Sequence, residues 1–437
     1  MQALAQQHSA YRRQFDALDR TAEPAWLAQR REQAIERFER LGFPTKRIEA
    51  WRNINLAAFG QHEFVPAPAP AGAAAASGLE LDRAHRLAFV DGHYNAEASS
   101  PGELPAGVTV LTLREALAAE HPALTEHLGR QLSAEHAFAA LNEALWQDGV
   151  LLHLQPGTVL DMPLLLDFAR SARADRAAYP RVLVVAESGA QAQLIEHYRG
   201  PADTAYLSCP VTELVLAANA GIEWYKLQEE GAGAFHFGSI VAELERDARF
   251  KAHSLASGGK LARTELYVNL NGPGADAQLD GLYLTGEGQY SDHHSWMEHR
   301  AGHCSSRQRF KGVLDGKSEA VYDGLVRVAH GAAKTDAQQE NRNLLLSKRA
   351  LAHSNPRLEI YTDDVKCSHG STVGELDRDA LFYLRSRGIG HDDARALLTY
   401  AFAAELLTAI GIDGLRDYEQ RALFALLPGD ATVREVL

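Results

Sequence analysis

A cysteine and a histidine stand two positions apart near the C-terminal end of the sequence, as Cys367 and His369 within residues 363–370. On an extended strand, residues two apart point to the same side, so the thiol and the imidazole would project together, opposite Lys366 and Ser368. Both groups bind soft or borderline metal ions, but two ligands are too few for a closed site. The missing ligands would have to come from elsewhere, such as another subunit. The alternative is that both residues belong to an ordinary buried strand.

A second group of potential metal ligands comprises His293, His294, His299, His303 and Cys304. Imidazole and thiolate bind zinc or iron, so a free-standing metal site is one interpretation. The spacing matches no helical His-Glu-x-x-His site, and on a strand His294 and His299 would face opposite sides. Histidines held by hydrogen bonds within the fold are therefore the favoured interpretation.

Residues 312–318 read Gly-Val-Leu-Asp-Gly-Lys-Ser and resemble a phosphate-binding P-loop. That motif needs four residues between its glycines, whereas three separate Gly312 from Gly316. The motif must also open a helix, but residues 319–328 alternate between apolar and polar as a strand does. Nucleotide hydrolysis by this chain is not expected.

The composition limits the classes of partner. The chain has 437 residues and a formal net charge of -13, which disfavours nucleic acid and anionic membranes because both attract basic surfaces. Three widely spaced cysteines cannot form a disulfide framework. We find no signal-peptide pattern at the N-terminus and no unbroken apolar run of the roughly 18 residues that a membrane helix needs. These features predict a cytoplasmic protein.

The sequence divides into three regions that differ in their predicted secondary structure. Residues 1–149 are mainly helical, with one helix running from about residue 24 to Gly42 and a short strand at 87–92, and a Pro/Ala-rich linker is expected near residues 65–78. Residues 150–375 consist of short strands between turn residues. Residues 376–437 return to helical patterns.

The central strands follow one another without intervening helices. Within residues 319–328, one face carries Ala320, Tyr322, Gly324, Val326 and Val328, and the other carries charged residues. Turn signals recur every 14 or 15 residues at Gly274, Gly288, His303 and Lys317. Such a pattern fits either a sandwich or a stacked parallel coil, and the number of similar units favours the coil.

Two helices are expected near the C-terminus. Asp377 can cap a helix over 378–387 that Gly388 ends, and a second helix should run from about Asp392 to Ile410. We expect the second helix to bury, or to offer to another protein, a stripe formed by Leu397, Tyr400, Ala401, Ala404, Leu407 and Thr408.

Longer stretches around the Cys-Ser-His triplet carry a family resemblance. Residues 334–347 (KTDAQQENRNLLLS), 358–361 (LEIY), 363–370 (DDVKCSHG) and 381–389 (LFYLRSRGI) together resemble the SufB/SufD family of iron-sulfur cluster assembly proteins. The resemblance extends from about residue 150 to the C-terminus, with weaker similarity at 44–51 and 141–145. The triplet favours the SufD branch, because SufB chains usually lack that cysteine.

The resemblance implies a mainly β protein: a right-handed parallel β-helix flanked by N-terminal and C-terminal helical domains. It implies a non-catalytic scaffold subunit that pairs with SufB through the β-helix and holds the ATPase SufC on its C-terminal helices. No permanent cofactor is expected. A transient iron-sulfur cluster would form at the SufB-SufD interface, with His369 as a candidate ligand and Cys367 as a weaker one.

For the SufC contact we expect the helices after Gly374, at about 377–387 and 392–410, with contact residues Leu381, Phe382, Tyr383, Arg385 and Arg387. Two alternatives stay open at this point. A homodimer could form in the absence of SufB, and the chain could instead be a stand-alone β-helix enzyme, either polysaccharide-active or metal-dependent through His294, His299, His303 and Cys304.

Overall fold

Two long parallel sheets dominate the computed structural model, which describes residues 10–69, 77–130 and 136–426. Successive strands alternate between the sheets, and each strand pairs in parallel with the strand that follows it in the same sheet. This arrangement is a parallel solenoid, as predicted, and not a sandwich. Each turn of the solenoid contributes one strand to each sheet.

The first sheet, called sheet A here, contains the strands β5 (Gly149–Leu154), β8 (Arg181–Ala186), β11 (Val211–Leu216), β13 (Phe235–Leu244), β15 (Leu261–Leu270), β17 (Tyr290–His299), β19 (Glu319–Val328) and β21 (Leu351–Ile360). The second, sheet B, contains β6 (Leu164–Ala169), β9 (Gln191–Arg199), β12 (Gly221–Glu229), β14 (Arg249–Ala256), β16 (Asp276–Thr285), β18 (Ser305–Leu314), β20 (Thr335–Leu345) and β22 (Val365–Gly374).

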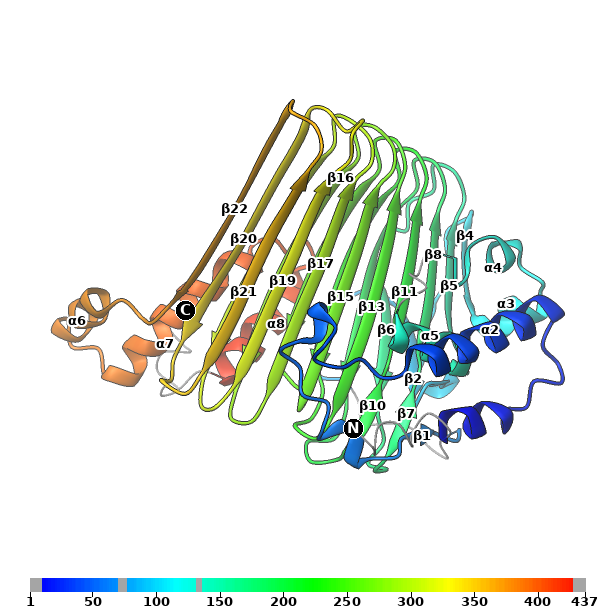
Figure 1. Ribbon diagram of the computed structural model, residues 1–437, viewed down its shortest axis with the longest axis horizontal. Coiled ribbons are helices and arrows are strands. Elements are labelled where there is room, and N and C mark those ends of the chain that lie inside the picture. Colours follow the sequence, from blue (N-terminus) through cyan, green and yellow to red (C-terminus); the bar gives the residue numbers. More distant parts are fainter. Residues whose placement is uncertain (1–9, 70–76, 131–135, 427–437) are drawn as a thin grey trace.

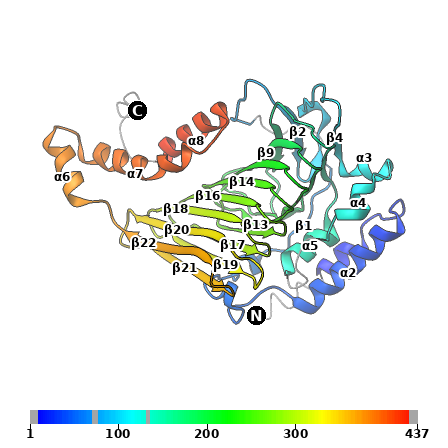
Figure 2. The same ribbon diagram turned by 90° about the horizontal axis from the view of Figure 1, so that it is seen from above.

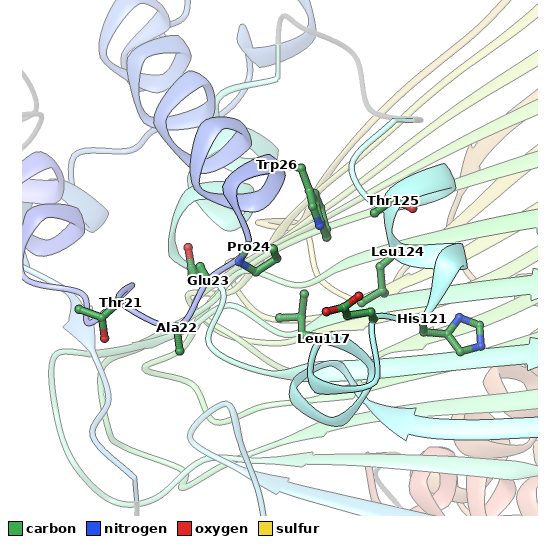
Figure 3. Close-up of a pocket in the computed structure, with 10 residues that line it drawn as sticks. Thr21, Ala22, Glu23, Pro24, Trp26, Leu117, His121, Leu124 and Thr125 are labelled. Carbon is green, nitrogen blue, oxygen red and sulfur yellow. The ribbon is translucent and has the colours of Figure 1, made fainter.

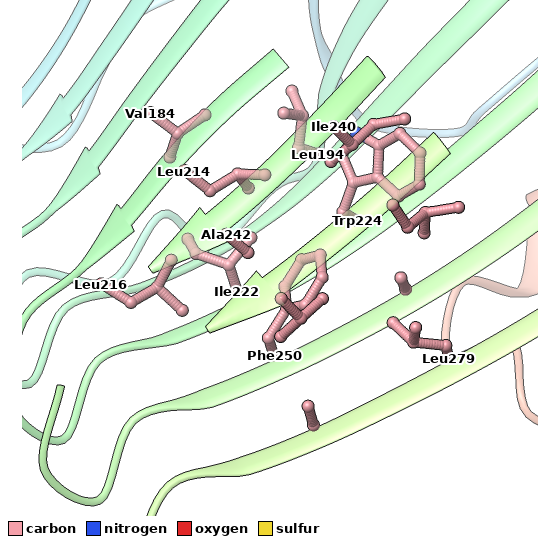
Figure 4. Close-up of a cluster of buried hydrophobic side chains, with 14 of the residues drawn as sticks. Val184, Leu194, Leu214, Leu216, Ile222, Trp224, Ile240, Ala242, Phe250 and Leu279 are labelled. Carbon is pink, nitrogen blue, oxygen red and sulfur yellow. The ribbon is translucent and has the colours of Figure 1, made fainter. Parts of the chain in front are cut away.

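Alternation along the strands decides which side chains enter the interior between the sheets. In β19, the predicted apolar face from Ala320 to Val328 is buried, while Glu319 and Arg327 lie on the outer face. Figure 4 shows the resulting core, to which sheet A contributes Val184, Leu214 and Ile240 and sheet B contributes Leu194, Trp224 and Phe250. Burial of these side chains is the main favourable term for this fold.

The predicted turns lie where the backbone changes direction between the sheets. Gly274, Gly288 and His303 all have positive φ, at 77°, 77° and 61°. Glycine reaches this region without steric cost, which explains why glycines mark two of these three turns.

Helices of the N-terminal region cover the outer face of sheet A (Figures 1 and 2). The predicted long helix is confirmed as α2 (Ala25–Leu41), which ends at Gly42. The other helices are α3 (Leu113–Ala118), α4 (Pro122–His127), α5 (Ala137–Leu145), η1 (Glu49–Trp51), η2 (Phe59–Gln61) and η3 (Ala96–Ala98). A buried pair between Arg181 and Glu213, with an Arg181 Nη2 to Glu213 Oε2 distance of 2.6 Å, lies under α5.

The sheets begin earlier in the chain than the sequence indicated. The predicted strand at 87–92 is found as β2 (His85–Val90), which pairs with β3 (His93–Tyr94) and extends sheet B, while β4 (Val108–Thr112) extends sheet A. The expected Pro/Ala linker is partly wrong, because β1 (Val65–Pro66) pairs with β7 (Arg176–Ala178) and Ala67 is fully buried. The strand β10 (Tyr206–Ser208) pairs with β7 and β13. Residues 70–76 of that linker lie outside the described residues.

Three helices follow the solenoid: α6 (Arg378–Ser386), α7 (His391–Leu407) and α8 (Asp413–Leu426). The predicted cap is confirmed, since Asp377 accepts hydrogen bonds from the backbone N–H groups of Asp379 and Ala380, and Gly388 has a φ of 90°. Residues of α7 and α8 pack on leucines of sheet B, whereas α6 lies apart from the sheets (Figures 1 and 2).

The stripe predicted on α7 is not the buried face of this helix, and its alternative role as a docking surface stays a prediction. Of the six residues of the stripe only Leu407 is buried, and the buried face instead comprises Ala394, Ala396, Thr399, Ala403, Leu406 and Leu407. Lys311 of β18 explains part of this orientation, because its ammonium group donates to the carbonyl oxygen of Phe402 and to the carboxylate of Glu405. None of the described helices is long and apolar enough to cross a membrane.

Candidate functional site

The solenoid ends at β21 and β22, which are the last strands of sheets A and B. In the described part of the chain, no later strand pairs with either of them. Their inner faces are therefore only half covered, and the free edges of both strands carry unpaired backbone groups. We call this feature the open end, defined as residues 351–374.

Cys367 and His369 both lie on the inner face of β22. They are the register partners of Ala337 and Gln339, which are buried in the solenoid interior. Cys367 packs partly against the core, and His369 is exposed. The two side chains thus share a face, as their spacing predicts, and the expectation of a wholly buried strand is wrong. Their role as ligands stays a prediction.

The protonation state of the Cys367 thiol affects its ability to bind a metal ion. Burial raises the pKa of the Cys367 thiol above its ordinary value, so this group is protonated at neutral pH. A protonated thiol is a poor metal ligand, because metal binding requires the thiolate. The imidazole of His369 is therefore the better candidate in the isolated chain.

Serine side chains link the two strands of the open end. The hydroxyl of Ser371 donates to the hydroxyl of Ser354 across the interior, at an Oγ to Oγ distance of 2.7 Å. Ser354 also lines a polar pocket of about 330 Å³ on the outer face of sheet A, together with Asp292, His294, Asp323 and His353. Polar groups are thus concentrated around the last turn of the solenoid.

Most of the large exposed apolar side chains belong to the last two strands of the solenoid and to the segment that follows them. Eight large apolar residues are exposed in the described chain, and six of them fall between residues 351 and 383: Leu351, Ile360, Tyr361, Val373, Phe382 and Tyr383. The other two, Ile48 and Val159, lie elsewhere. Clusters of exposed apolar residues mark surfaces that bind other proteins.

The residues expected to contact an ATPase lie on α6. Phe382 is 73% exposed and Tyr383 is 56% exposed, and no residue of this helix is buried. Leu381 is half-buried, Arg385 is exposed, and the guanidinium of Arg387 donates to the hydroxyl of Tyr383. This helix therefore presents an aromatic and basic surface to solvent.

The structure does not bring the histidine-rich run together. His294 lies on the outer face of β17 beside Arg263 and Asp292, whereas His299 points inward, within hydrogen-bonding distance of the hydroxyl of Ser306. His303 occupies a turn, and the buried thiol of Cys304 donates to the carbonyl of Gly272. Across the described residues, no three His, Cys, Asp or Glu side chains are placed to hold a metal ion.

The P-loop-like segment is a connection between two strands. The first strand, β18, ends at Leu314, and β19 begins at Glu319, so no helix follows the lysine and serine of the motif. The expectation that this segment is not a P-loop is confirmed.

Sequence reasoning missed Lys226 and named His293 only within the histidine-rich run, without placing either residue inside the solenoid. Burial lowers the pKa of Lys226 to about 8 and that of His293 to about 3, so the His293 ring is neutral. Strand alternation places both residues on inner faces, but this signal is clear only once the strand register is known.

Sequence reasoning also missed a pocket of about 560 Å³ in the N-terminal region (Figure 3). It lies between the start of α2 and the segment joining α3 to α4, and Trp26, Leu117 and Leu124 supply its apolar wall. None of its lining residues belongs to the open end.

Comparison with known proteins matches most of the chain to two family models. The model for the SufBD core domain of the SUF system for FeS cluster assembly covers residues 168–402, and that for the SufBD N-terminal region covers residues 1–166. The chain is 34% identical to the iron-sulfur cluster assembly protein SufD of Escherichia coli over 92% of this chain and 93% of that protein.

Two further relatives cover similar shares. An iron-sulfur cluster assembly SufBD family protein of Synechocystis is 31% identical over 90% of each chain. The iron-sulfur cluster assembly protein SufD of Bacillus subtilis is 26% identical over 90% of this chain and 92% of that protein.

Proposed function

The chain belongs to the SufBD family of iron-sulfur cluster assembly proteins, and we propose that it acts as the SufD-type scaffold subunit. In this proposal the open end pairs with a SufB chain, α6 holds the ATPase SufC, and His369 helps to bind a cluster that forms transiently between the two scaffold chains. The chain itself supplies geometry and ligands, and it performs no turnover of its own.

The observation that carries the proposal is the unfinished last turn of the solenoid. Free strand edges favour addition of further strands, and natural proteins usually block such edges with charges, prolines or covering loops. Here β21 contains Pro356 and β22 contains Lys366, but β22 also exposes Val373 at 48% and β21 exposes Ile360 at 40%. A partner whose own strands or apolar side chains cover this end would satisfy both the backbone groups and the apolar surface.

The chemistry of the open end supports a shared site. His369 offers one strong ligand atom, and Cys367 offers a second only after it loses its proton. A cluster needs more ligands than these, so the partner must provide the others. A cluster held in this way would be released when the two chains move apart, as an assembly scaffold requires.

The proposed SufC contact depends on α6. Exposed aromatic and arginine residues are enriched in protein interfaces, and Phe382 and Tyr383 of this short helix are grouped with Arg387 at its C-cap. Because α7 and α8 are anchored on sheet B, a force applied to α6 would be transmitted to the solenoid. Movement of SufC could in this way change the geometry of the open end.

Charge substitutions would test the pairing. This chain, SufB and SufC should be co-expressed under anaerobic conditions, with Val373→Asp as the test variant and Val159→Asp as the control. Both valines are about half exposed, and only Val373 lies at the open end. We expect Val373→Asp to lose SufB and Val159→Asp to retain it. Equal retention of SufB by the two variants would contradict the pairing.

The SufC contact can be tested in the same preparation. Phe382→Asp should reduce co-purification of SufC while SufB stays bound, and Ile48→Asp serves as the control because Ile48 is exposed at 50% in another region. Unchanged SufC content in Phe382→Asp would rule out α6 as the docking helix.

A further inference from the structure

A buried glutamine lies one strand below His369. Gln339 of β20 is 3% exposed, and within the described chain neither amide atom meets hydrogen-bond geometry with a partner, although the Tyr322 hydroxyl lies close enough to interact with the amide. A buried amide normally has its donors and acceptor satisfied, because an unpaired polar group costs about 1–3 kcal/mol. Such an amide is available to a further hydrogen-bond partner.

The strand register places this amide directly beneath the candidate ligand. Gln308, Gln339 and His369 are successive register partners on β18, β20 and β22, and all three project into the interior. Adjacent strands lie about 4.8 Å apart, so side chains at paired positions can touch. Gln339 is the last member of this row that is covered, and His369 is the exposed one above it.

The opposite sheet leaves room for the amide. Gly324 of β19 has no side chain, and a Cβ atom there would lie 2.2 Å from the amide nitrogen of Gln339 and 2.5 Å from the hydroxyl of Tyr322. The glutamine therefore reaches across the interior and rests on the backbone of Gly324, beside Tyr322. This contact places the amide at the last covered level of the interior.

We propose that Gln339, whose amide makes no hydrogen bond to His369 in the described structure, turns from Tyr322 to hydrogen-bond one ring nitrogen of that imidazole, which leaves the other nitrogen free to bind metal. The inference rests on the proposed function of His369. Histidines that bind metals usually use their second ring nitrogen in a hydrogen bond, which sets the tautomer and the ring orientation. Gln339 is therefore a positioning residue and does not itself bind the cluster.

The tautomer of His369 provides a direct test in the full-length chain. Histidine rings labelled with nitrogen-15 would be observed by NMR at pH 8.5, and the His369 signals would be assigned by their loss in His369→Ala. Gln339→Met keeps the length of the side chain but removes its hydrogen bonds. Gln338→Met is the matched control, because Gln338 is on the same strand but is exposed on the outer face.

We expect Gln339→Met to change the ratio of the two neutral tautomers by about threefold to tenfold, the range that one hydrogen bond supports, and Gln338→Met to leave it unchanged. Gly324→Ala is a second test if Gln339→Met does not fold. Its new methyl group would displace the amide without removing it, and the tautomer ratio should change in the same direction. An unchanged ratio in both variants would overturn the proposal.

Cluster content in the complex with SufB and SufC separates this inference from the proposed function. We expect Gln339→Met to lower iron and sulfide per complex relative to Gln338→Met. If the wild-type complex holds no cluster, the proposed function fails while the tautomer result still stands. If the wild type holds a cluster and the tautomer ratio is insensitive to Gln339, only the positioning role fails.

Discussion

The N-cap of α6 gives a prediction whose size can be worked out from the structure. The carboxylate of Asp377 accepts hydrogen bonds from the N–H groups of Asp379 and Ala380, at O to N distances of 2.8 and 3.1 Å. The helix is nine residues long and buries none of them. Isolated helices shorter than about 12 residues are only marginally stable, so this cap is a large part of what stabilises α6.

We predict that Asp377→Ala destabilises α6 by about 1 kcal/mol, the usual cost of losing an acidic N-cap. That free energy corresponds to about a fivefold increase in the population of the unfolded helix. Because α6 contributes no buried apolar surface, the solenoid should keep its stability against global unfolding.

Hydrogen exchange is the suitable assay, because it reports local opening residue by residue. Amides of residues 378–386 should exchange about fivefold faster in Asp377→Ala than in wild type, and those of β19 should not change. Asp392→Ala is the control, since Asp392 is an exposed acidic residue in the first turn of α7. SufC affinity should fall by less than this factor, because it depends on the fraction of α6 that is folded, and that fraction changes little while the helix is mostly folded. Unchanged exchange in α6 would refute the reasoning.

Two further predictions concern buried ion pairs. Arg181→Met should destabilise the fold by about 3–5 kcal/mol in chemical denaturation, because it leaves the fully buried carboxylate of Glu213 without its guanidinium partner. A decrease in the free energy of unfolding below about 1 kcal/mol would show that the ion pair is not needed for stability. Burial alone would lower the pKa of His253, but the Glu419 carboxylate of α8 outweighs burial and raises it. The stability from this pair is present in full below about pH 6.5 and is lost as the pH rises through the folded-state pKa. Hydrogen exchange in α8 should therefore be faster at pH 8.5 than at pH 6, after correction for intrinsic rates, and His253→Gln should remove this difference. The same pH dependence in the variant would contradict the assignment.

The solenoid could be predicted because its strands carry a strong alternating pattern. Residues 319–328 place small and apolar side chains on every second position, and the structure buries that whole face. Positive φ at Gly274, Gly288 and His303 confirms the turn spacing. Repetition of one strand and one turn is a local property, which sequence patterns report well.

Contacts between distant segments could not be predicted in this way. Val65–Pro66 forms a strand because β7, more than a hundred residues later, offers an edge to pair with. Residues of α7 are apolar on most sides, so its buried face depends on where Lys311 and the leucines of sheet B lie. The residue pattern within one segment does not indicate which distant segment it will pack against.

In the candidate site, too, local spacing could be predicted and contacts between distant segments could not. Spacing alone placed Cys367 and His369 on one face of a strand. The order in which the strands stack cannot be read from this spacing. Only that order shows that β22 is the last strand of its sheet and that Gln339 lies beneath His369.

The central claim is that His369 contributes to a cluster site shared with SufB. The most direct measurement is iron and acid-labile sulfide per anaerobically purified complex of this chain with SufB and SufC, compared between wild type and His369→Ala. His330→Ala is the control, because His330 is also an exposed histidine but belongs to the turn after β19. We predict that all three complexes form and that only His369→Ala lacks the cluster. Equal cluster content in His369→Ala and wild type would contradict the claim.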